Sequence, residues 1–463
     1  MPLASCSDSV PEDLRSWQPP TRSQILKLAL PAAGSFILSN FYNINDLYFA
    51  GRISQDANNA IGLCMMVLIF NAAFIVLASR GALSLVARLT GARDTEAAGR
   101  AAAQGILLSF CITIPVAVLG WLIAPHLLAW MGGRDEVLLL ATRYLRMIYL
   151  GFPVLAFQPM IDSIFLARGN SRTVFQNQLM ATGLNTALNT VVVFALHGGL
   201  AGIAAASILS RAIAGARGFW LLTRGRNPLP LPPVLSWRPR ISTLLEMIRV
   251  GIPASLSVAF YSGIFMVLNR LLSRFGQEAF GVLGIGIRGI ESIGFMVLMG
   301  FGVAASALSG QAIGAGRADS ARLTGWRVTS AALPIALFFS LVWWFLPLPL
   351  IGLYTQDPRV TELTVVYLRM AAIANLFQLI ENIPGDCLSG AGVPRRQFMV
   401  SVPGNLLRIP LAWGLVEYTS LGINAVWLAI LISAVLKGLA MLAVFRFADW
   451  PEEAARKLHR ALD

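Results

Sequence analysis

The sequence predicts an all-α integral membrane protein with twelve transmembrane helices, arranged as two parallel-repeat bundles of six helices each. The chain of 463 residues is 56% hydrophobic and only 13% charged, whereas soluble domains carry roughly 25% charged residues. Its apolar runs, such as 105–123 and 331–353, are long enough to cross a bilayer as helices. An internal repeat is the remaining observation that predicts this fold.

The repeat is visible as short motifs that recur in the second half of the chain at a nearly constant offset. Gln55-Asp56-Ala57 returns as Gln277-Glu278-Ala279, and Gly91-Ala92 returns as Gly314-Ala315. Because six spans separate the copies, both halves begin in the same orientation and are related by an axis along the membrane normal. Duplicated halves of this kind are common in transporters, since two matching bundles can rock around a central site.

Apolar stretches place six helices in each half. In the first half they are 25–50, 60–87, 101–130, 137–167, 173–196 and 200–223, and in the second half 244–272, 279–311, 323–354, 361–389, 397–417 and 421–447. The predicted division is a cytoplasmic tail 1–24, an N-terminal bundle 25–223, a proline-rich cytoplasmic linker 224–243, a C-terminal bundle 244–447 and a cytoplasmic tail 448–463.

Arginine positions predict the orientation, because cytoplasmic loops are enriched in Arg and Lys. Loops after even-numbered spans carry several arginines, among them Arg168, Arg172, Arg317 and Arg395, and loops after odd-numbered spans carry few. Both termini are therefore expected in the cytoplasm, with the protein in the plasma (inner) membrane. The net charge of +13 reflects this orientation and does not predict nucleic-acid binding.

Asp46 is the polar residue that most needs a functional explanation, because a carboxylate at bilayer depth costs a few kcal/mol on insertion scales. It ends a stripe formed by Ser35, Ser39 and Asn43, whose steps of four, four and three lie on one helical face. The alternative is an interfacial aspartate that caps the loop at Gly51.

Other helices add polar residues that would matter if they met Asp46. Asn185 and Asn189 lie four apart on one face, and Ser207 follows in the next helix. Hydrogen bonding between helices is the alternative interpretation. In the second half, Glu381 is interpreted as a second ionisable site or a cavity wall. Glu291 follows Arg288 by three residues, a spacing that also permits an intrahelical ion pair.

Aromatic and amide side chains are the main candidates for a substrate cavity, joined by two glutamates. The candidates are Tyr42, Phe157, Gln158, Tyr261, Glu291, Gln378, Glu381 and Asn382. Ordinary packing is the alternative for each of the aromatic residues. Nothing in the chain resembles a catalytic constellation or an ATP-binding P-loop, so we expect neither an enzyme nor an ATP-driven pump.

Three stretches resemble the MATE (multidrug and toxic compound extrusion) family of transporters. They are Asn43-Ile-Asn-Asp46-Leu-Tyr-Phe-Ala-Gly51-Arg, Ala167-Arg168-Gly169-Asn-Ser-Arg172 and Gly284-Ile-Gly-Ile-Arg288-Gly-Ile-Glu291-Ser. The resemblance covers essentially all twelve spans. It implies two six-helix bundles that form a V, and export of organic, often cationic compounds in exchange for protons or sodium ions.

The resemblance also assigns roles to particular residues. Asp46 matches the first-helix aspartate of cation coupling, Asn185 matches an asparagine that surrounds it, and Ser207 falls where the proton-linked branch often has threonine. Asn43 belongs to the same expected coupling set.

This chain departs from the family at two positions. Asn189 stands where the proton-linked branch often has aspartate, and Tyr261 stands where the sodium-linked branch often has glutamate. Glu381 falls where the sodium-linked branch has aspartate. The coupling ion therefore stays open between a proton and a sodium ion at Asp46.

The expected partners are small organic substrates and membrane lipids, with no nucleic acid and no cofactor, and we expect a monomer. A rival function is a lipid-linked saccharide flippase of the same superfamily. Such a site needs cations for pyrophosphate, and Arg211 in the middle of the sixth helix is the one good candidate.

Overall fold

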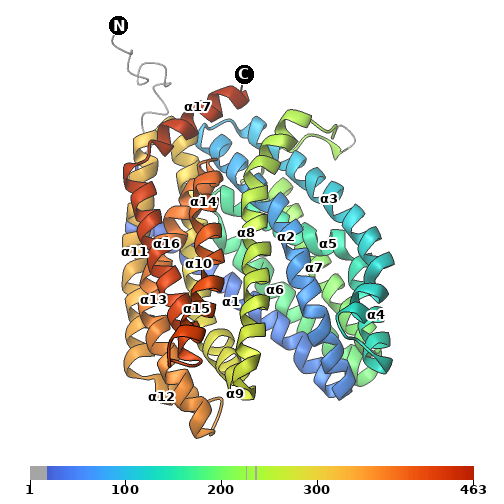
Figure 1. The fold of residues 1–463 in the computed structure, drawn as a ribbon. Helices are drawn as coiled ribbons and strands as arrows, with labels where there is room; N and C mark the ends of the chain where they lie inside the picture. Colours follow the sequence, from blue (N-terminus) through green and yellow to red (C-terminus); the bar gives the residue numbers. More distant parts are fainter. Residues whose placement is uncertain (1–17, 226, 235–236, 463) are drawn as a thin grey trace. The chain divides into compact units, whose positions relative to one another are not determined.

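The computed structural model describes residues 18–225, 227–234 and 237–462, and these form helices and no strand. Figure 1 shows the helices along the chain. The first half contains α1 (Arg22–Ile53), α2 (Gln55–Gly91), α3 (Thr95–Trp130), α4 (Asp135–Leu150), α5 (Phe152–Ala167), α6 (Ser171–Thr190), the π-helical turn η2 (Val191–Ala195) and α7 (Gly199–Arg224).

The second half repeats this order with more interruptions. It contains α8 (Ile241–Leu272), η4 (Ser273–Phe275), α9 (Gln277–Val282), the π-helical segment η5 (Leu283–Glu291), α10 (Ser292–Gly314), α11 (Ala318–Phe345), α12 (Pro347–Gly352), α13 (Pro358–Gly390), α14 (Pro394–Leu406), α15 (Arg408–Tyr418), α16 (Asn424–Phe447) and α17 (Trp450–Leu462).

The chain is a multi-pass membrane protein by its helices. Among the described residues, ten helices are long and apolar enough to cross a membrane, and the bent pair α4–α5 makes an eleventh. The expected fifth span, 173–196, is helical as α6 and η2, but its polar face keeps it below the same apolar content. That face carries Asn177, Gln178, Asn185 and Asn189.

Some spans predicted as single helices are broken, and proline stands at these breaks. The span 137–167 bends by 53° between α4 and α5, where Gly151 is followed by Phe152 and Pro153. Proline lacks the N–H needed inside a helix and is tolerated in the first turn. Pro347 likewise begins α12 after α11. The predicted tail 448–463 contains the helix α17.

The repeat is reproduced in the backbone. Left-handed φ angles occur in three pairs that share one offset along the chain: Arg93 and Gly316 (56° and 69°), Gly169 and Gly392 (78° and 88°), Gly199 and Gly422 (60° and 59°). A positive φ is a specific conformational choice for the chain, so its recurrence at equivalent turns indicates that the two halves share one helical plan.

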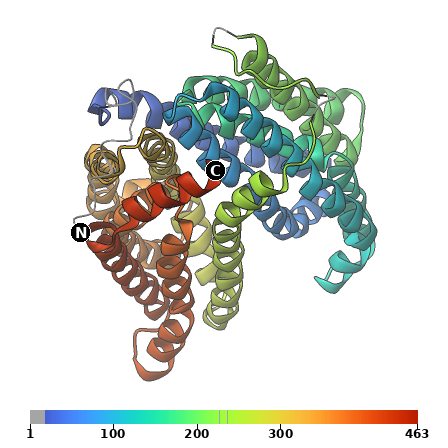
Figure 2. The ribbon, with the colours of Figure 1, turned by 90° about the horizontal axis from the view of Figure 1, so that it is seen from above.

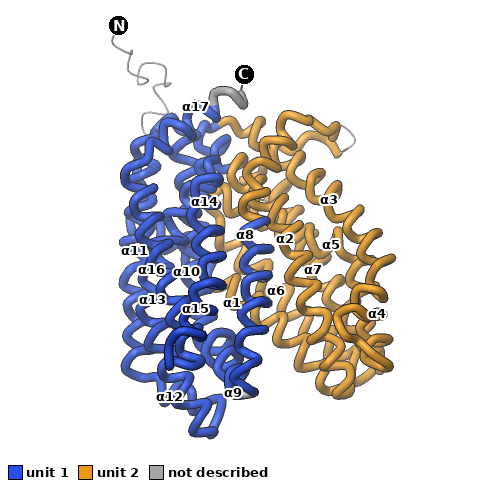
Figure 3. The backbone as a smooth tube through the Cα atoms, in the orientation of Figure 1, with its two compact units in different colours: residues 1–33, 87–93, 256–463 blue, residues 34–86, 94–255 orange. Residues whose placement is uncertain are grey.

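The chain divides into two compact units, coloured separately in Figure 3. Unit 1 comprises the described parts of Met1–Ala33, Ala87–Arg93 and Leu256–Asp463, and unit 2 comprises Gly34–Val86 and Asp94–Ser255. The predicted boundaries at 25–223 and 244–447 stay a prediction. The predicted tail 1–24 lies outside the described residues up to residue 17, and α1 begins at Arg22.

Close backbone contacts join helices within unit 1. A Cβ on Gly314 would overlap the carbonyl oxygen of Arg88, and a Cβ on Gly91 would overlap that of Gln311. Gly91 and Gly314 are equivalent positions of the repeat, and both lie where the end of α2 crosses the end of α10. The helix α17 packs across the ends of α10 and α11, as the view in Figure 2 shows.

The linker of unit 2 is fixed against α3. Gln104 donates from Nε2 to the carbonyl oxygen of Arg238 at 2.8 Å, and its Oε1 accepts from the backbone N–H of Arg240 at 2.8 Å. Gly99 has no side chain where the carbonyl oxygen of Pro230 approaches. The predicted spacer is thus anchored at two places in its described part.

Candidate functional site

Asp46 is the centre of a buried polar cluster in unit 2. The residue is 8% exposed, and its carboxylate accepts three hydrogen bonds. Asn185 Nδ2 and Asn189 Nδ2 donate to Oδ1 at 3.0 and 2.7 Å, and Ser207 Oγ donates to Oδ2 at 2.8 Å. The structure thus brings together α1, α6 and α7 at residues predicted for cation coupling.

The amides around Asp46 fix one another's orientation. Asn185 Oδ1 accepts from Asn45 Nδ2 at 2.7 Å and from Asn189 Nδ2 at 3.3 Å. Reversing the Asn185 amide alone would place N–H against N–H and remove a donor from Asp46. Asn189 Oδ1 is buried with no hydrogen-bond partner among the described residues.

The structure does not bring Asn43 to the cluster, contrary to the prediction. Asn43 is exposed and makes no hydrogen bond to the cluster among the described residues. Asn45 contacts the cluster instead. A step of three or four residues from Asp46 selects the same face of a helix, which is why Asn43 was expected. Asn185 of α6 instead contacts α1 at Asn45, the residue directly before Asp46.

Tyr42 lies beside the cluster, about one helical turn before Asp46. Its hydroxyl lies 3.0 Å from the carbonyl oxygen of Ser207, to which it donates, and 3.0 Å from Ser210 Oγ. The guanidinium carbon of Arg211 lies 4.4 Å from the centre of the Tyr42 ring. Arg211, the cation of the flippase alternative, is therefore engaged in a cation–π contact.

A second buried carboxyl of unit 2 is Asp162 on α5. Asn177 Nδ2 donates to its Oδ1 at 3.0 Å, and Gln158 Nε2 donates to its Oδ2 at 3.3 Å. Gln158 also donates to Gln178 Oε1 at 3.4 Å. Phe157, predicted to line a cavity, packs against Phe110 and Phe219 at 6.0 Å between ring centres.

Unit 1 holds Glu291 against α13 and not against its own helix. Tyr367 donates from its hydroxyl to Glu291 Oε2, and Gln378 Nε2 donates to Oε1 at 3.3 Å. Among the described residues, the contacts of the Glu291 carboxylate are with Tyr367 and Gln378, and the ion pair with Arg288 that the spacing permits is not formed. Asn382 donates to the backbone of Gln378, at 2.9 Å. Tyr261 is 44% exposed and packs on Phe265.

Glu381 has a partner that sequence analysis did not identify. Lys437 Nζ of α16 lies 2.7 Å from Glu381 Oε2, with side chains 5% and 6% exposed. Lys437 also donates to Asn405 Oδ1 at 2.9 Å. Buried Arg408, on α15, donates from Nε to Ser433 Oγ at 3.1 Å. The second ionisable site therefore already contains its own cation.

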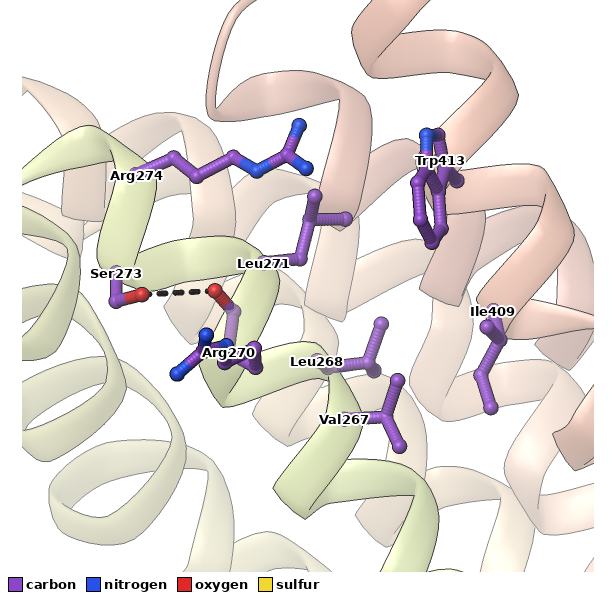
Figure 4. Close-up of a pocket in the computed structure, with 8 residues that line it drawn as sticks. All are labelled: Val267, Leu268, Arg270, Leu271, Ser273, Arg274, Ile409 and Trp413. Atoms are coloured by element: carbon purple, nitrogen blue, oxygen red, sulfur yellow. Dashed lines mark hydrogen bonds between the residues drawn. The ribbon is translucent and has the colours of Figure 1, made fainter.

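The position that the repeat aligns with Asp46 is different in character. It falls at Leu268 and Asn269, and Leu268 lines a cavity of about 470 Å³ in unit 1. Figure 4 shows its other residues, including Val267, Ile409 and Trp413. The lining combines apolar side chains with Arg270, Ser273 and Arg274 and contains no carboxylate, so the polar contents of the two halves have diverged.

The MatE family profile matches residues 31–212 and 253–413, which is most of both halves. The chain belongs to the MATE family. A curated relative, the probable multidrug resistance protein NorM of Thermotoga maritima, is 26% identical over 446 residues, covering 94% of each chain.

Solved MATE structures share this fold. One, described as a MATE in the bent conformation, has a TM-score of 0.87 at 21% identity and covers 97% of this chain and 99% of its own. Another, described as the outward-facing conformation of a multidrug resistance MATE family transporter, has a TM-score of 0.85 at 21% identity and covers 98% and 100%. At these identities the likeness concerns the fold.

Within this MATE chain, sequence analysis missed Asn45, Tyr367, Arg408 and Lys437. Lys437 is the most consequential and had a visible signal, since it is the one lysine inside the apolar stretch 421–447. An ionisable residue at that depth requires a partner, and Glu381 was the candidate. Tyr367 had no such signal, because a buried tyrosine is common in helical cores.

Proposed function

We propose that this MATE-family chain is a proton-coupled antiporter that exports organic compounds, with Asp46 as the group that exchanges the proton. The supporting observation is the buried Asp46 carboxyl, which accepts from Asn185, Asn189 and Ser207. The relative's name, multidrug resistance protein, supports organic substrates. The inner membrane and cytoplasmic termini are part of the proposal.

The chemistry follows from the donors at Asp46. In the ionised state all three contacts are donated to the carboxylate, and such charge-assisted bonds are stronger than neutral ones. A proton added at Oδ2 would meet the hydroxyl of Ser207, 2.8 Å away. Ser207 then accepts instead of donating, and its own hydroxyl hydrogen must find another acceptor. Protonation thus rearranges contacts between α1 and α7.

This rearrangement supplies a coupling device. Antiport requires that protonation and substrate binding favour opposite states. Asp46 joins three helices through hydrogen bonds, so a change in its charge changes how α1, α6 and α7 are held together. A charge that moves inward through 100 mV contributes about 2.3 kcal/mol in addition to the proton gradient.

A sodium ion is the second candidate, and the donor set disfavours it. Sodium is a hard cation that is held by oxygen ligands, by analogy with other hard cations. Here two amide N–H groups and one hydroxyl already point at the carboxylate. For Asn185 to turn its oxygen toward a cation, Asn45 would also have to reverse, because Asn45 donates to Asn185 Oδ1.

The second half supports the same assignment. Glu381 is paired with Lys437 at 2.7 Å, so the ammonium group of Lys437 occupies the position next to this carboxylate that a coupling sodium ion would have to take. The flippase alternative is weakened because Arg211 stacks on Tyr42. We therefore assign coupling to unit 2 and expect Asp46 to carry it alone.

The test is transport in vesicles that contain the purified protein. A pH gradient and a sodium gradient are imposed separately, and export of a fluorescent organic cation is followed. We expect the pH gradient to drive export and Asp46→Asn to reduce it to background while the protein still folds. Asp162→Asn is the matched control, since Asp162 is also buried and held by two amides. Export by Asp46→Asn at the normal rate would contradict the proposal.

A further inference from the structure

Unit 2 contains a basic cavity whose lining includes no residue of the Asp46 cluster. Its volume is about 520 Å³, and it lies where α5 ends, α6 begins, α7 ends and the linker starts. Three arginines line it, Arg168, Arg172 and Arg217, together with polar groups from Asn170 and Asn227. No carboxylate is among its lining residues.

The arginines of this cavity have only neutral partners among the described residues. Arg168 donates from Nη1 to the carbonyl oxygen of Asn227 at 3.0 Å, and Arg217 donates to Asn177 Oδ1. Arg172 is exposed and makes no hydrogen bond or ion pair within the described part of the chain. Burial lowers the pKa of Arg168, because its charge is incompletely hydrated and no anion compensates for it.

The stretch of sequence that forms the cavity contains no carboxylate. Between Asp162 and Glu246 the chain has no aspartate or glutamate, but it has eight arginines. Asp162 itself lies behind Asn177, which donates to it at 3.0 Å. A positive region of this length without a counter-charge attracts anions.

At the equivalent turn of the second half, an arginine next to the counterpart of Arg172 is paired with a carboxylate of the same chain. Arg395 is the repeat counterpart of Arg172, and the turns before them share left-handed glycines at 169 and 392. The next residue, Arg396, forms an ion pair with Glu453 of α17 at 2.8 Å. In the first half the segment after α7 is the linker, which supplies no carboxylate.

The position of the cavity indicates which anion is available. It lies at the ends of α5 and α7, and α7 is long and apolar enough to cross a membrane. Trp220, next to the lining residue Leu221, is 55% exposed. Exposed tryptophan favours the membrane–water interface, and basic pockets on the cytoplasmic side of helices suit lipid head groups.

We propose that the cavity of Arg168, Arg172 and Arg217 binds the phosphate of an anionic phospholipid from the cytoplasmic leaflet. The phosphate supplies a negative charge near this turn, as the Glu453 carboxylate does for Arg396 in the second half. Arginine suits this ligand, because its planar fork donates two parallel hydrogen bonds to phosphate oxygens. The lipid's acyl chains lie along the apolar surface near Trp220. Anionic lipid therefore fastens the linker to the rest of unit 2.

The test measures lipid retention on the full-length protein by native mass spectrometry. The protein in detergent is titrated with phosphatidylglycerol, and separately with phosphatidylcholine and inorganic phosphate. Arg172→Gln is the test variant, since Arg172 is exposed and its loss leaves no buried group unpaired. Arg395→Gln is its matched control, at the equivalent turn of the second half.

We expect the wild type to retain phosphatidylglycerol in preference to phosphatidylcholine. Arg172→Gln should weaken this binding on the order of tenfold, as expected for the loss of one charge-assisted contact, and Arg395→Gln should leave it unchanged. Equal retention by Arg172→Gln and the wild type would overturn the site. Inorganic phosphate that binds as tightly as the lipid would overturn the lipid assignment. Because binding is read without transport, neither result depends on the proposed antiport.

Discussion

The buried ion pair of unit 1 gives the sharpest test of how the two halves divide their work. Lys437 and Glu381 lie 2.7 Å apart with side chains 5% and 6% exposed. At this distance and an effective dielectric constant of about 20, their attraction is about 6 kcal/mol. Burial of each charge costs several kcal/mol. The pair therefore contributes little net stability, but each charge needs the other.

The perturbation is a double-mutant cycle. Lys437→Met leaves the Glu381 carboxylate buried without a cation, and removing one partner of such a pair costs about 3–5 kcal/mol. Glu381→Gln leaves the ammonium buried, with Asn405 Oδ1 as a neutral partner at 2.9 Å. The double variant removes both charges, so its stability should return to within about 1–2 kcal/mol of the wild type.

The assay is thermal unfolding in detergent, combined with proton-driven export in vesicles. The exposed pair Arg274–Glu417 is the control, because it has the same kind of contact at 2.8 Å with side chains 52% and 47% exposed. Its cycle should give a coupling energy of only about 0.2–1 kcal/mol. Single variants of Glu381 and Lys437 as stable as the double variant would refute the reasoning. A double variant that folds but has lost all export would refute the assignment of coupling to Asp46.

Three further predictions concern single positions. Ser207→Ala removes one of three donors to Asp46 and should lower proton-driven export on the order of tenfold, since such a bond is worth about 1.5–3 kcal/mol. Ser210 contacts Tyr42 and not Asp46, so Ser210→Ala should export at close to the wild-type rate in the same vesicle assay. Gly314→Ala should destabilise the protein by about 1–3 kcal/mol or more, because its Cβ would overlap the carbonyl oxygen of Arg88. A Cβ on Gly284 meets no atom within 4 Å, so Gly284→Ala should leave the stability nearly unchanged. Equal melting temperatures for the two variants would contradict the close backbone contact between Gly314 and Arg88. Burial raises the pKa of Glu453, but hydrogen bonds from Lys457 and Arg396 outweigh this effect and hold the pKa below its usual range. The stabilisation of α17 by Glu453 is therefore present above the unfolded pKa of about 4.3 and is lost as the pH falls through the folded pKa. Hydrogen exchange in α17 should rise on acidification of the wild type and be insensitive to acidification in Glu453→Gln.

The sequence predicted the helical plan well because membrane helices are encoded locally. Long apolar runs, prolines and glycines at turns, and arginines in alternate loops are each readable without tertiary contacts. The breaks were missed because an apolar run has the same composition whether it is straight or bent. Gly151 with Pro153 was a visible signal for the bend between α4 and α5, and the polar content of α6 was a visible signal for its weaker span.

The candidate site was predicted in part for the same reason. Spacing of four residues placed Asn185 and Asn189 on one face, and the cost of a membrane carboxylate singled out Asp46. Spacing does not specify which face meets a neighbouring helix, so Asn43 was chosen where Asn45 makes the contact. Lys437 was a visible signal that a buried partner is needed, but its contact with Glu381 joins α13 to α16 from distant parts of the sequence, so tertiary structure was needed to identify the pair.

The divergence of the halves follows one physical rule. Each half inherited the same backbone plan, including the left-handed turns at 169 and 392, and therefore similar places where charge must be balanced. In unit 1 the balance is internal: Lys437 compensates Glu381, and Glu453 compensates Arg396. In unit 2, Asp46 and Arg172 have no opposite charge within hydrogen-bonding reach among the described residues: Asp46 has neutral donors, and exposed Arg172 has no hydrogen-bond partner. A half with uncompensated charges responds to protons and to lipid phosphates, so unit 2 is where we expect both coupling and lipid dependence to reside.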